Sequence, residues 1–178
     1  MTVMVALLRG VNVGGKTTTL PMAELRRAAE DLGYDDVATY IQSGNLVFRT
    51  SDSATTVEKA LAKAIAELGG VRPAVMARTL AQLRKVVDGN PFIRRGEDAK
   101  LCHAVFAAKA AKGSLAGLDL DAYLPEEAIA VGKELYLFLP SGVGRSKLAI
   151  DLAKNKGAVG TMRSWRTVTK LLEMAEAV

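Results

Sequence analysis

The first 78 residues alternate strand-like and helix-like apolar patterns in the order βαββαβ, and this order limits the folds that the segment can adopt. Strands are predicted over residues 3–8, 36–42, 46–49 and 73–77, and helices over residues 21–32 and 55–68. Ser43-Gly44-Asn45 supplies a tight turn between the second and third strands, because Gly and Asn tolerate a positive φ. The order predicts a four-stranded antiparallel sheet covered on one face by two helices.

The second half of the chain repeats parts of this order more loosely. Strands are predicted over residues 101–107, 129–131 and 135–139, and helices over residues 80–87, 108–116, 146–154 and 165–175. Residues 90–99 and 117–127 are expected to be irregular connections. We therefore predict an α+β protein of two ferredoxin-like α/β plait units, residues 1–78 and 79–178, with antiparallel sheets and closing C-terminal helices.

The composition favours a globular protein of the reducing cytoplasm. Hydrophobic residues make up 49% of the 178 residues, which is enough for a core. Cys102 is the single cysteine, so an intramolecular disulfide and a cysteine metal cluster are both excluded. No apolar stretch approaches the roughly 18 residues of a membrane span, and the N-terminus lacks a secretory signal pattern. We expect no membrane association, no metal and no cofactor.

Charge is distributed unevenly along the chain. The net charge is +5, with an excess of basic residues over 72–112 and 140–178 and an excess of acidic residues over 113–139. Such an asymmetry suggests an anionic partner, either nucleic acid or a phosphorylated metabolite. An ordinary solvated surface would give the same composition, so charge alone does not decide between them.

A basic glycine-rich loop follows the first strand and is the main candidate site. Its candidate ligand-binding residues are Arg9, Gly10, Asn12, Gly14, Gly15 and Lys16. Successive glycines let backbone N–H groups turn toward an anion, and the basic side chains add charge. The alternative is a structural turn in which Asn12 satisfies local backbone groups. The loop also fits G-x-x-x-x-G-K-[ST], but a nucleotide-binding P-loop opens directly into a helix of a parallel sheet, and the predicted order differs.

Further candidates lie in other loops. Ser43 and Asn45 of the hairpin turn are included in the candidate site, together with Arg145, Ser146 and Lys147 of a second glycine loop. Ser146 is suited to cap the helix that follows, so a plain helix cap is the alternative there.

The only tryptophan, Trp165, lies between Arg163 and Arg166, and this arrangement could stack a base or ring. A core position for Trp165 is the favoured interpretation, because apolar residues continue from it at helical spacing. His103 is the only histidine and is interpreted as structural, since no acidic or nucleophilic partner is close in sequence.

Several motifs together resemble the bacterial domain-of-unknown-function family numbered 1697. They occupy residues 6–16, 20–25, 40–45, 144–148 and 161–168. Ser164 and Arg166 differ from that family's pattern, which has asparagine at both positions, and Thr17 is uncommon in it. The resemblance covers nearly the whole chain and implies two plait-like units, in agreement with the element order. It implies no activity.

Three functional hypotheses follow. The leading one is a binding protein that holds an anionic ligand, nucleic acid or a phosphorylated metabolite, through its basic glycine-rich loops. The second is an enzyme acting on a phosphorylated or acyl small molecule, in which Arg9, Asn12, Ser43, Asn45 and Arg145 converge on a pocket. The third is a protein–protein interaction module. The sequence identifies no catalytic residue.

Overall fold

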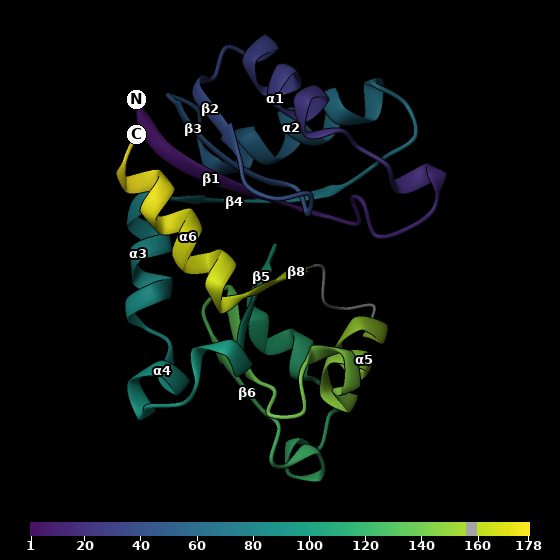
Figure 1. Ribbon diagram of the computed structural model, residues 1–178, viewed down its shortest axis with the longest axis vertical. Coiled ribbons are helices and arrows are strands. Elements are labelled where there is room, and N and C mark those ends of the chain that lie inside the picture. Colours follow the sequence, from purple (N-terminus) through teal and green to yellow (C-terminus); the bar gives the residue numbers. More distant parts are fainter. Residues whose placement is uncertain (156–159) are drawn as a thin grey trace. The chain divides into compact units, whose positions relative to one another are not determined.

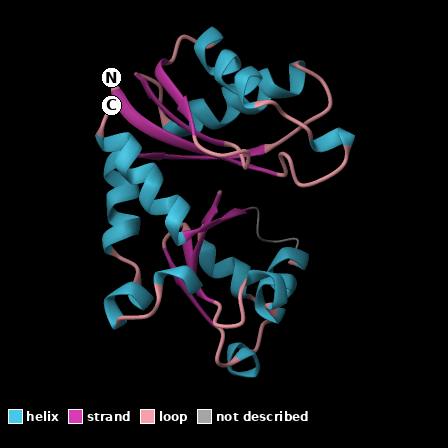
Figure 2. Cartoon of the chain, viewed as in Figure 1, coloured by secondary structure: helices cyan, strands magenta, loops and turns pink. Residues whose placement is uncertain are grey.

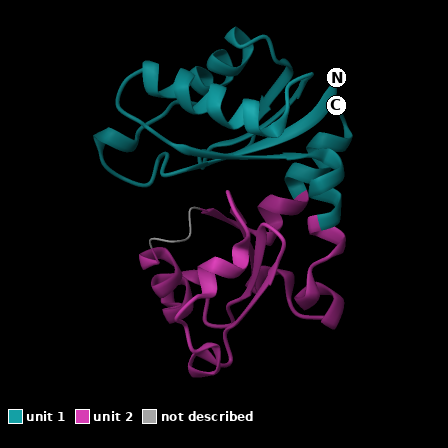
Figure 3. Ribbon diagram, turned by 180° about the vertical axis from the view of Figure 1, so that it is seen from behind, with its two compact units in different colours: residues 1–85, 170–178 teal, residues 86–169 magenta. Residues whose placement is uncertain are grey.

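The chain forms two units, each with its own four-stranded antiparallel sheet (Figure 3). The computed structural model describes residues 1–155 and 160–178. Unit 1 comprises Met1–Lys85 and Lys170–Val178, and unit 2 comprises Val86–Thr169. The division therefore falls inside α3 (Leu80–Asp88) and again inside α6 (Trp165–Glu176).

Unit 1 has the predicted βαββαβ order (Figure 1). Its elements are β1 (Thr2–Arg9), η1 (Lys16–Thr18), α1 (Met22–Asp31), β2 (Asp35–Thr39), β3 (Asn45–Thr50), α2 (Ala54–Glu67) and β4 (Ala74–Thr79). The strand order is β2-β3-β1-β4, and every neighbouring pair is antiparallel. The end of β1 and the end of β2 therefore lie at the same end of the sheet as the start of β3 and the start of β4.

The core of unit 1 lies between this sheet and helices α1 and α2, which cover one of its faces. Alternate residues of β1, namely Met4, Ala6 and Leu8, point into that core because side chains alternate between the faces of a strand. Leu61 and Ile65 come from the apolar stripe of α2, where residues four apart share one face. The binary pattern of the sequence is thus sufficient to position both helices.

Unit 2 repeats the strand order of unit 1 with a different helical layer (Figure 2). Its strands are β5 (Cys102–Ala107), β6 (Glu127–Val131), β7 (Glu134–Phe138) and β8 (Gly160–Ser164), in the order β6-β7-β5-β8. Before β5 come α4 (Pro91–Arg95) and η2 (Ala99–Leu101); between the strands come η3 (Ala111–Leu115), η4 (Leu120–Tyr123), η5 (Val143–Arg145) and α5 (Lys147–Lys154). The first plait helix is thus replaced by two short 3-10 helices.

The predicted fold class is confirmed, and four local expectations are wrong. In place of the helix expected over residues 108–116 the structure has the 3-10 helix η3. Residues 91–95 form α4 rather than an irregular connection, because the side chain of Asn90 accepts hydrogen bonds from Phe92 N and Ile93 N and Pro91 occupies the first helical position. The β8 strand was not predicted, because Gly160–Ser164 is short and polar. The second strand ends at Thr39, since Ile41 has a φ of +48°, which is incompatible with extended backbone.

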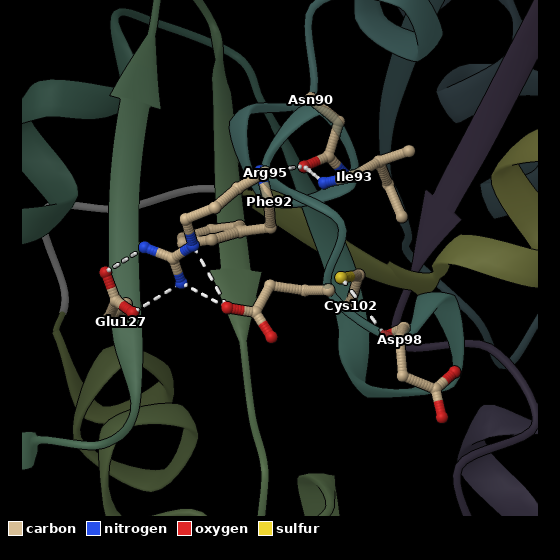
Figure 4. A network of polar contacts seen from close by, with 8 residues as sticks. Asn90, Phe92, Ile93, Arg95, Asp98, Cys102 and Glu127 are labelled. Atoms are coloured by element: carbon tan, nitrogen blue, oxygen red, sulfur yellow. Dashed lines mark hydrogen bonds and ion pairs between the residues drawn. The ribbon is translucent and has the colours of Figure 1, made fainter.

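Arg95 joins α4 to the edge strand β6 in unit 2 (Figure 4). Its guanidinium donates two hydrogen bonds to the Glu127 carboxylate, at 3.1 and 2.7 Å, and one to Glu97 at 3.0 Å. The same group lies 5.2 Å from the ring centre of Phe92 and 5.9 Å from that of Phe138. The hydrogen bonds from Arg95 lower the pKa of Glu127 below its usual value.

This pair makes part of the stability of unit 2 dependent on pH. The pKa of Glu127 is lower in the folded state than in the unfolded state, where it is about 4.3. The ion pair therefore adds to the free energy of unfolding above about pH 4.3, and this stabilisation is lost as the pH falls through the folded-state pKa. We expect Glu127→Gln to reduce the free energy of unfolding at neutral pH and to differ less from the wild type at about pH 3. Urea unfolding at both pH values measures the difference, with Glu173→Gln in the exposed Lys170 pair as control. An equal deficit at both pH values would show that charge is not the cause.

Candidate functional site

The glycine-rich loop after β1 is held in shape by the side chain of Asn12. Its Nδ2 donates to Leu20 O at 2.9 Å and to Gln42 O at 2.7 Å, and its Oδ1 accepts from Leu20 N at 2.8 Å. The Asn12 backbone N–H donates to Thr18 O at 2.7 Å. Asn12 has a φ of +53°, a conformation that asparagine adopts more readily than most residues. Asn12 therefore closes the loop on itself and ties it to the connection between β2 and β3.

That connection packs closely against the end of β1. Leu8 N donates to Gly44 O at 2.8 Å, and Asn45, fully buried, donates from Nδ2 to Tyr40 O and to Ser43 Oγ, both at 2.9 Å. Gly44 has a φ of +76°, and a Cβ at this position would lie 2.5 Å from Val11 Cγ2 and 2.8 Å from Leu8 Cβ. Only glycine fits there. Ser43 and Asn45 are thus brought to the candidate loop, with Asn45 in a structural role.

Two carbonyl oxygens of the loop accept hydrogen bonds from within the loop, whereas five of its amides donate to no acceptor in the described chain. The hydroxyl of Thr18 donates to Gly14 O at 2.8 Å and to Gly15 O at 3.1 Å, and Thr19 donates to Gly15 O at 3.3 Å. Within the residues that the structure describes, no acceptor is bonded to the five successive backbone amides of residues 13–17. These residues are all exposed. The loop therefore has a run of amide donors without a described acceptor in exposed residues, while its carbonyl oxygens at Gly14 and Gly15 are bonded internally.

The end of unit 1 that holds this loop is cationic. Residues 9–22, 39–45 and 68–74 meet there, as the strand directions require and Figure 1 shows, and they contain no aspartate or glutamate. They contribute Arg9, Lys16 and Arg72, all exposed. Arg26 of α1 donates to Thr39 Oγ1 at 2.8 Å at the same end, and the nearest acids in sequence are Glu24 in the first turn of α1 and Glu67 at the end of α2, which is paired with Lys63 at 3.8 Å.

The opposite end of the same sheet carries charges of both signs. Its acidic residues are Glu30, Asp31, Asp35, Asp36 and Asp52. Two of them are paired with arginines: Asp36 with Arg49 at 3.6 Å and Asp31 with Arg27 at 4.0 Å. The loop end thus differs from it in having three exposed cations and no acid within its three segments.

The second glycine loop differs from the first because the helix that follows it is already capped. Ser146 is buried, and its hydroxyl accepts from Ala149 N at 2.9 Å, as the sequence predicts. The carboxylate of buried Glu126 accepts from Leu148 N at 3.0 Å. A negative group of the chain itself thus occupies the N-terminus of α5. Arg145 and Lys147 are exposed beside it, in unit 2, whereas Arg9, Asn12, Ser43 and Asn45 belong to unit 1.

Arg163 and Trp165 are buried in the described structure. The Arg163 guanidinium donates to Thr161 Oγ1 at 2.6 Å and to Met162 O at 2.9 Å, and burial lowers its pKa to about 10. Trp165 packs against Tyr136 with ring centres 6.4 Å apart. The core interpretation of Trp165 is confirmed, and we leave both side chains out of the proposed site.

His103 lies on β5 and is also buried. Burial lowers its pKa, so the imidazole is neutral at neutral pH, and no acceptor or donor among the described residues is bonded to its Nδ1. No group of three or more His, Cys, Asp or Glu side chains in the described residues is arranged to hold a metal ion.

The P-loop interpretation is not supported by the geometry. The loop leads into the three-residue η1, α1 begins only at Met22, and the sheet is antiparallel throughout. No helix in the described parts of the chain is long and apolar enough to span a membrane.

Sequence reasoning missed several residues that shape the site. The hydroxyls of Thr18 and Thr19 donate to carbonyl oxygens of the loop, and the carbonyl oxygen of Gln42 accepts from Asn12. Arg72 lies at this end of the sheet only because β4 begins beside the end of β1. The role of Glu126 at α5 was also missed. Threonines that follow two glycines indicate a turn closed by side-chain hydrogen bonds, so this part could have been predicted. The positions of Arg72 and Glu126 depend on the pairing of strands and could not.

Replacing Asn12 tests its role in holding the loop. We expect Asn12→Ala to lower the free energy of unfolding by about 2 kcal/mol, because three side-chain hydrogen bonds are lost and alanine is strained at positive φ. Asn12→Gly loses the same bonds without the strain and serves as the matched comparison. Hydrogen exchange at the Leu20 amide should accelerate in both variants. Unchanged stability and exchange would contradict the role of Asn12.

Comparisons with known proteins agree with this description. The chain is similar to a conserved bacterial protein from Streptococcus pneumoniae, with a TM-score of 0.73, 24% sequence identity and 98% of each chain covered. This likeness supports the fold alone. No curated protein sequence matches the chain. The family model described as a protein of unknown function, DUF1697, matches residues 1–136. The chain therefore belongs to the DUF1697 family.

Proposed function

We propose that unit 1 binds a small phosphate-bearing ligand at the glycine-rich loop. One observation carries the proposal: the backbone amides of residues 13–17 belong to exposed residues and have no acceptor among the described residues, while the carbonyl oxygens of Gly14 and Gly15 accept from threonine hydroxyls. A run of backbone amides without acceptors attracts anions. Phosphate oxygens are suited to accept several such bonds at once.

The surrounding charge supports an anion rather than a neutral ligand. Lys16 lies within the run of five amides, and Arg9 and Arg72 lie at the same end of the sheet. The three converging segments contain no carboxylate. Such a field both strengthens binding and raises the rate of encounter with anions, and both effects fall as salt is added.

The extent of the cationic surface favours a compact ligand over a nucleic acid. The exposed cations Arg9, Lys16 and Arg72 form a small group at one end of unit 1, and arginines at the other end of the same sheet are paired with acids. Tyr40 is the only aromatic residue in the converging segments, whereas single-strand binding surfaces use several aromatic side chains as stacking platforms.

The same segments favour binding over catalysis. Residues 9–22, 39–45 and 68–74 contain no Asp, Glu, His or Cys, which are the commonest acids, bases and nucleophiles of enzyme active sites. The geometry thus supports a receptor for an anion, and we make no proposal of an enzymatic step.

Lys16→Gln tests the proposal directly. We expect it to weaken the binding of inorganic phosphate or pyrophosphate by about fivefold at low salt, because one cation beside the amides is removed. Lys147→Gln is the matched control, since Lys147 is equally exposed after a glycine loop but stands at a helix N-terminus already occupied by Glu126. Isothermal titration calorimetry measures both variants.

Three results would contradict the proposal. Phosphate could fail to bind the wild-type protein, or Lys147→Gln could weaken binding as much as Lys16→Gln does. A mixed-sequence oligonucleotide that binds far more tightly than any small phosphate would favour the nucleic-acid hypothesis instead.

A further inference from the structure

Two exposed apolar side chains lie on the two segments that Asn12 joins at this end of unit 1. Val13 is 72% exposed and Ile41 is 50% exposed. Val13 carries the first amide of the run, and Ile41 precedes Gln42, whose carbonyl accepts from Asn12 Nδ2 at 2.7 Å. Each of the two side chains is therefore one residue away from the hydrogen bond that joins the two segments.

The backbone at Ile41 is held in an unfavourable conformation. Its φ of +48° is rare for a β-branched residue, and glycine or asparagine would adopt it at lower cost. Hydrogen bonds on either side maintain it: Tyr40 N donates to Asn45 O at 3.1 Å, and Asn45 Nδ2 donates to Tyr40 O at 2.9 Å. Because the side chain is half exposed, core packing only partly offsets this cost. Strain of this kind is characteristic of binding sites.

Resting on the proposed function, we infer that the ligand is an organic phosphate whose phosphate group is attached to an apolar or aromatic group. The phosphate lies on the amides of residues 13–17, and the apolar group contacts Val13 and Ile41. The cationic surroundings complement the phosphate, whereas the two aliphatic side chains offer a sugar or glycerol group no hydrogen bond. A hydrophilic phosphate ester would leave both of them in water.

Three probes that each carry one phosphate group distinguish this inference from the proposed function. They are inorganic phosphate, glycerol phosphate and phenyl phosphate, titrated by calorimetry at one ionic strength. We expect phenyl phosphate to bind about fivefold more tightly than glycerol phosphate, as burying part of one ring against two aliphatic side chains would give.

Two variants test whether Val13 and Ile41 cause the preference for phenyl phosphate. Val13→Ser and Ile41→Asn should each reduce the advantage of phenyl phosphate. Ile41→Asn, which lies outside the run of amides, should in addition leave the affinity for inorganic phosphate unchanged. Asparagine is chosen at position 41 because it accepts the positive φ, so the variant retains the turn. Val143→Ser, at an exposed valine of the second glycine loop, is the matched control and should retain the full preference.

The outcomes that overturn the inference are distinct from those that overturn the proposed function. Equal affinities for phenyl and glycerol phosphate would refute the inference and leave the anion site standing, as would a preference that survives both substitutions. Failure of all three probes to bind the wild-type protein would overturn the proposed function, and the inference with it.

Discussion

The hydrogen bonds of a single side chain, Asn12, determine the shape of the candidate site. The end of β1 could lead into a glycine-rich loop of many conformations, because glycine restricts the backbone little. Three side-chain bonds to Leu20 and Gln42 select one of them and attach it to the β2–β3 connection. These bonds use backbone atoms of Leu20 and Gln42, and the amides of residues 13–17 have no acceptor among the described residues. A loop on a rigid sheet end is thereby preorganised, which reduces the entropy lost on binding.

The two units show how one topology can be used in two ways. Both have the strand order of a ferredoxin-like plait, with β5 of unit 2 at the position of β1. In unit 1 the loop donors have no acceptor among the described residues, whereas in unit 2 the N-terminus of α5 is bonded to Glu126 and Ser146 of the chain itself. A helix N-terminus next to glycines is therefore not evidence of a ligand site unless its donors are unoccupied. This difference assigns the candidate site to unit 1.

Much of the fold was predictable because it depends on local periodicity. The continuous apolar run of β1 predicts a buried strand, the helical spacing of Val57, Leu61 and Ile65 in α2 predicts one buried face, and these expectations are confirmed. The strand β8 and the capped α4 were missed, since one has a short polar sequence and the other is five residues long.

The candidate site was less predictable than the fold. The basic glycine loop was visible in the sequence, but its donor pattern depends on Thr18 and Asn12 bonds across the loop, and its charge depends on Arg72 arriving through sheet pairing. Ile41 has no sequence signal for a positive φ, because it is a residue type that normally avoids one. Such departures from local preference are expected where a chain is shaped for binding.

A titration with phosphate followed by two-dimensional ¹H–¹⁵N NMR reveals whether the amides of residues 13–17 contact the anion. As phosphate is added at constant ionic strength, the account predicts saturable shifts of the amide resonances from Val13 to Thr17, while those of Leu148 and Ala149 at the occupied end of α5 stay in place. Saturable shifts centred on α5, or no saturable shift in the glycine-rich loop, would contradict the account.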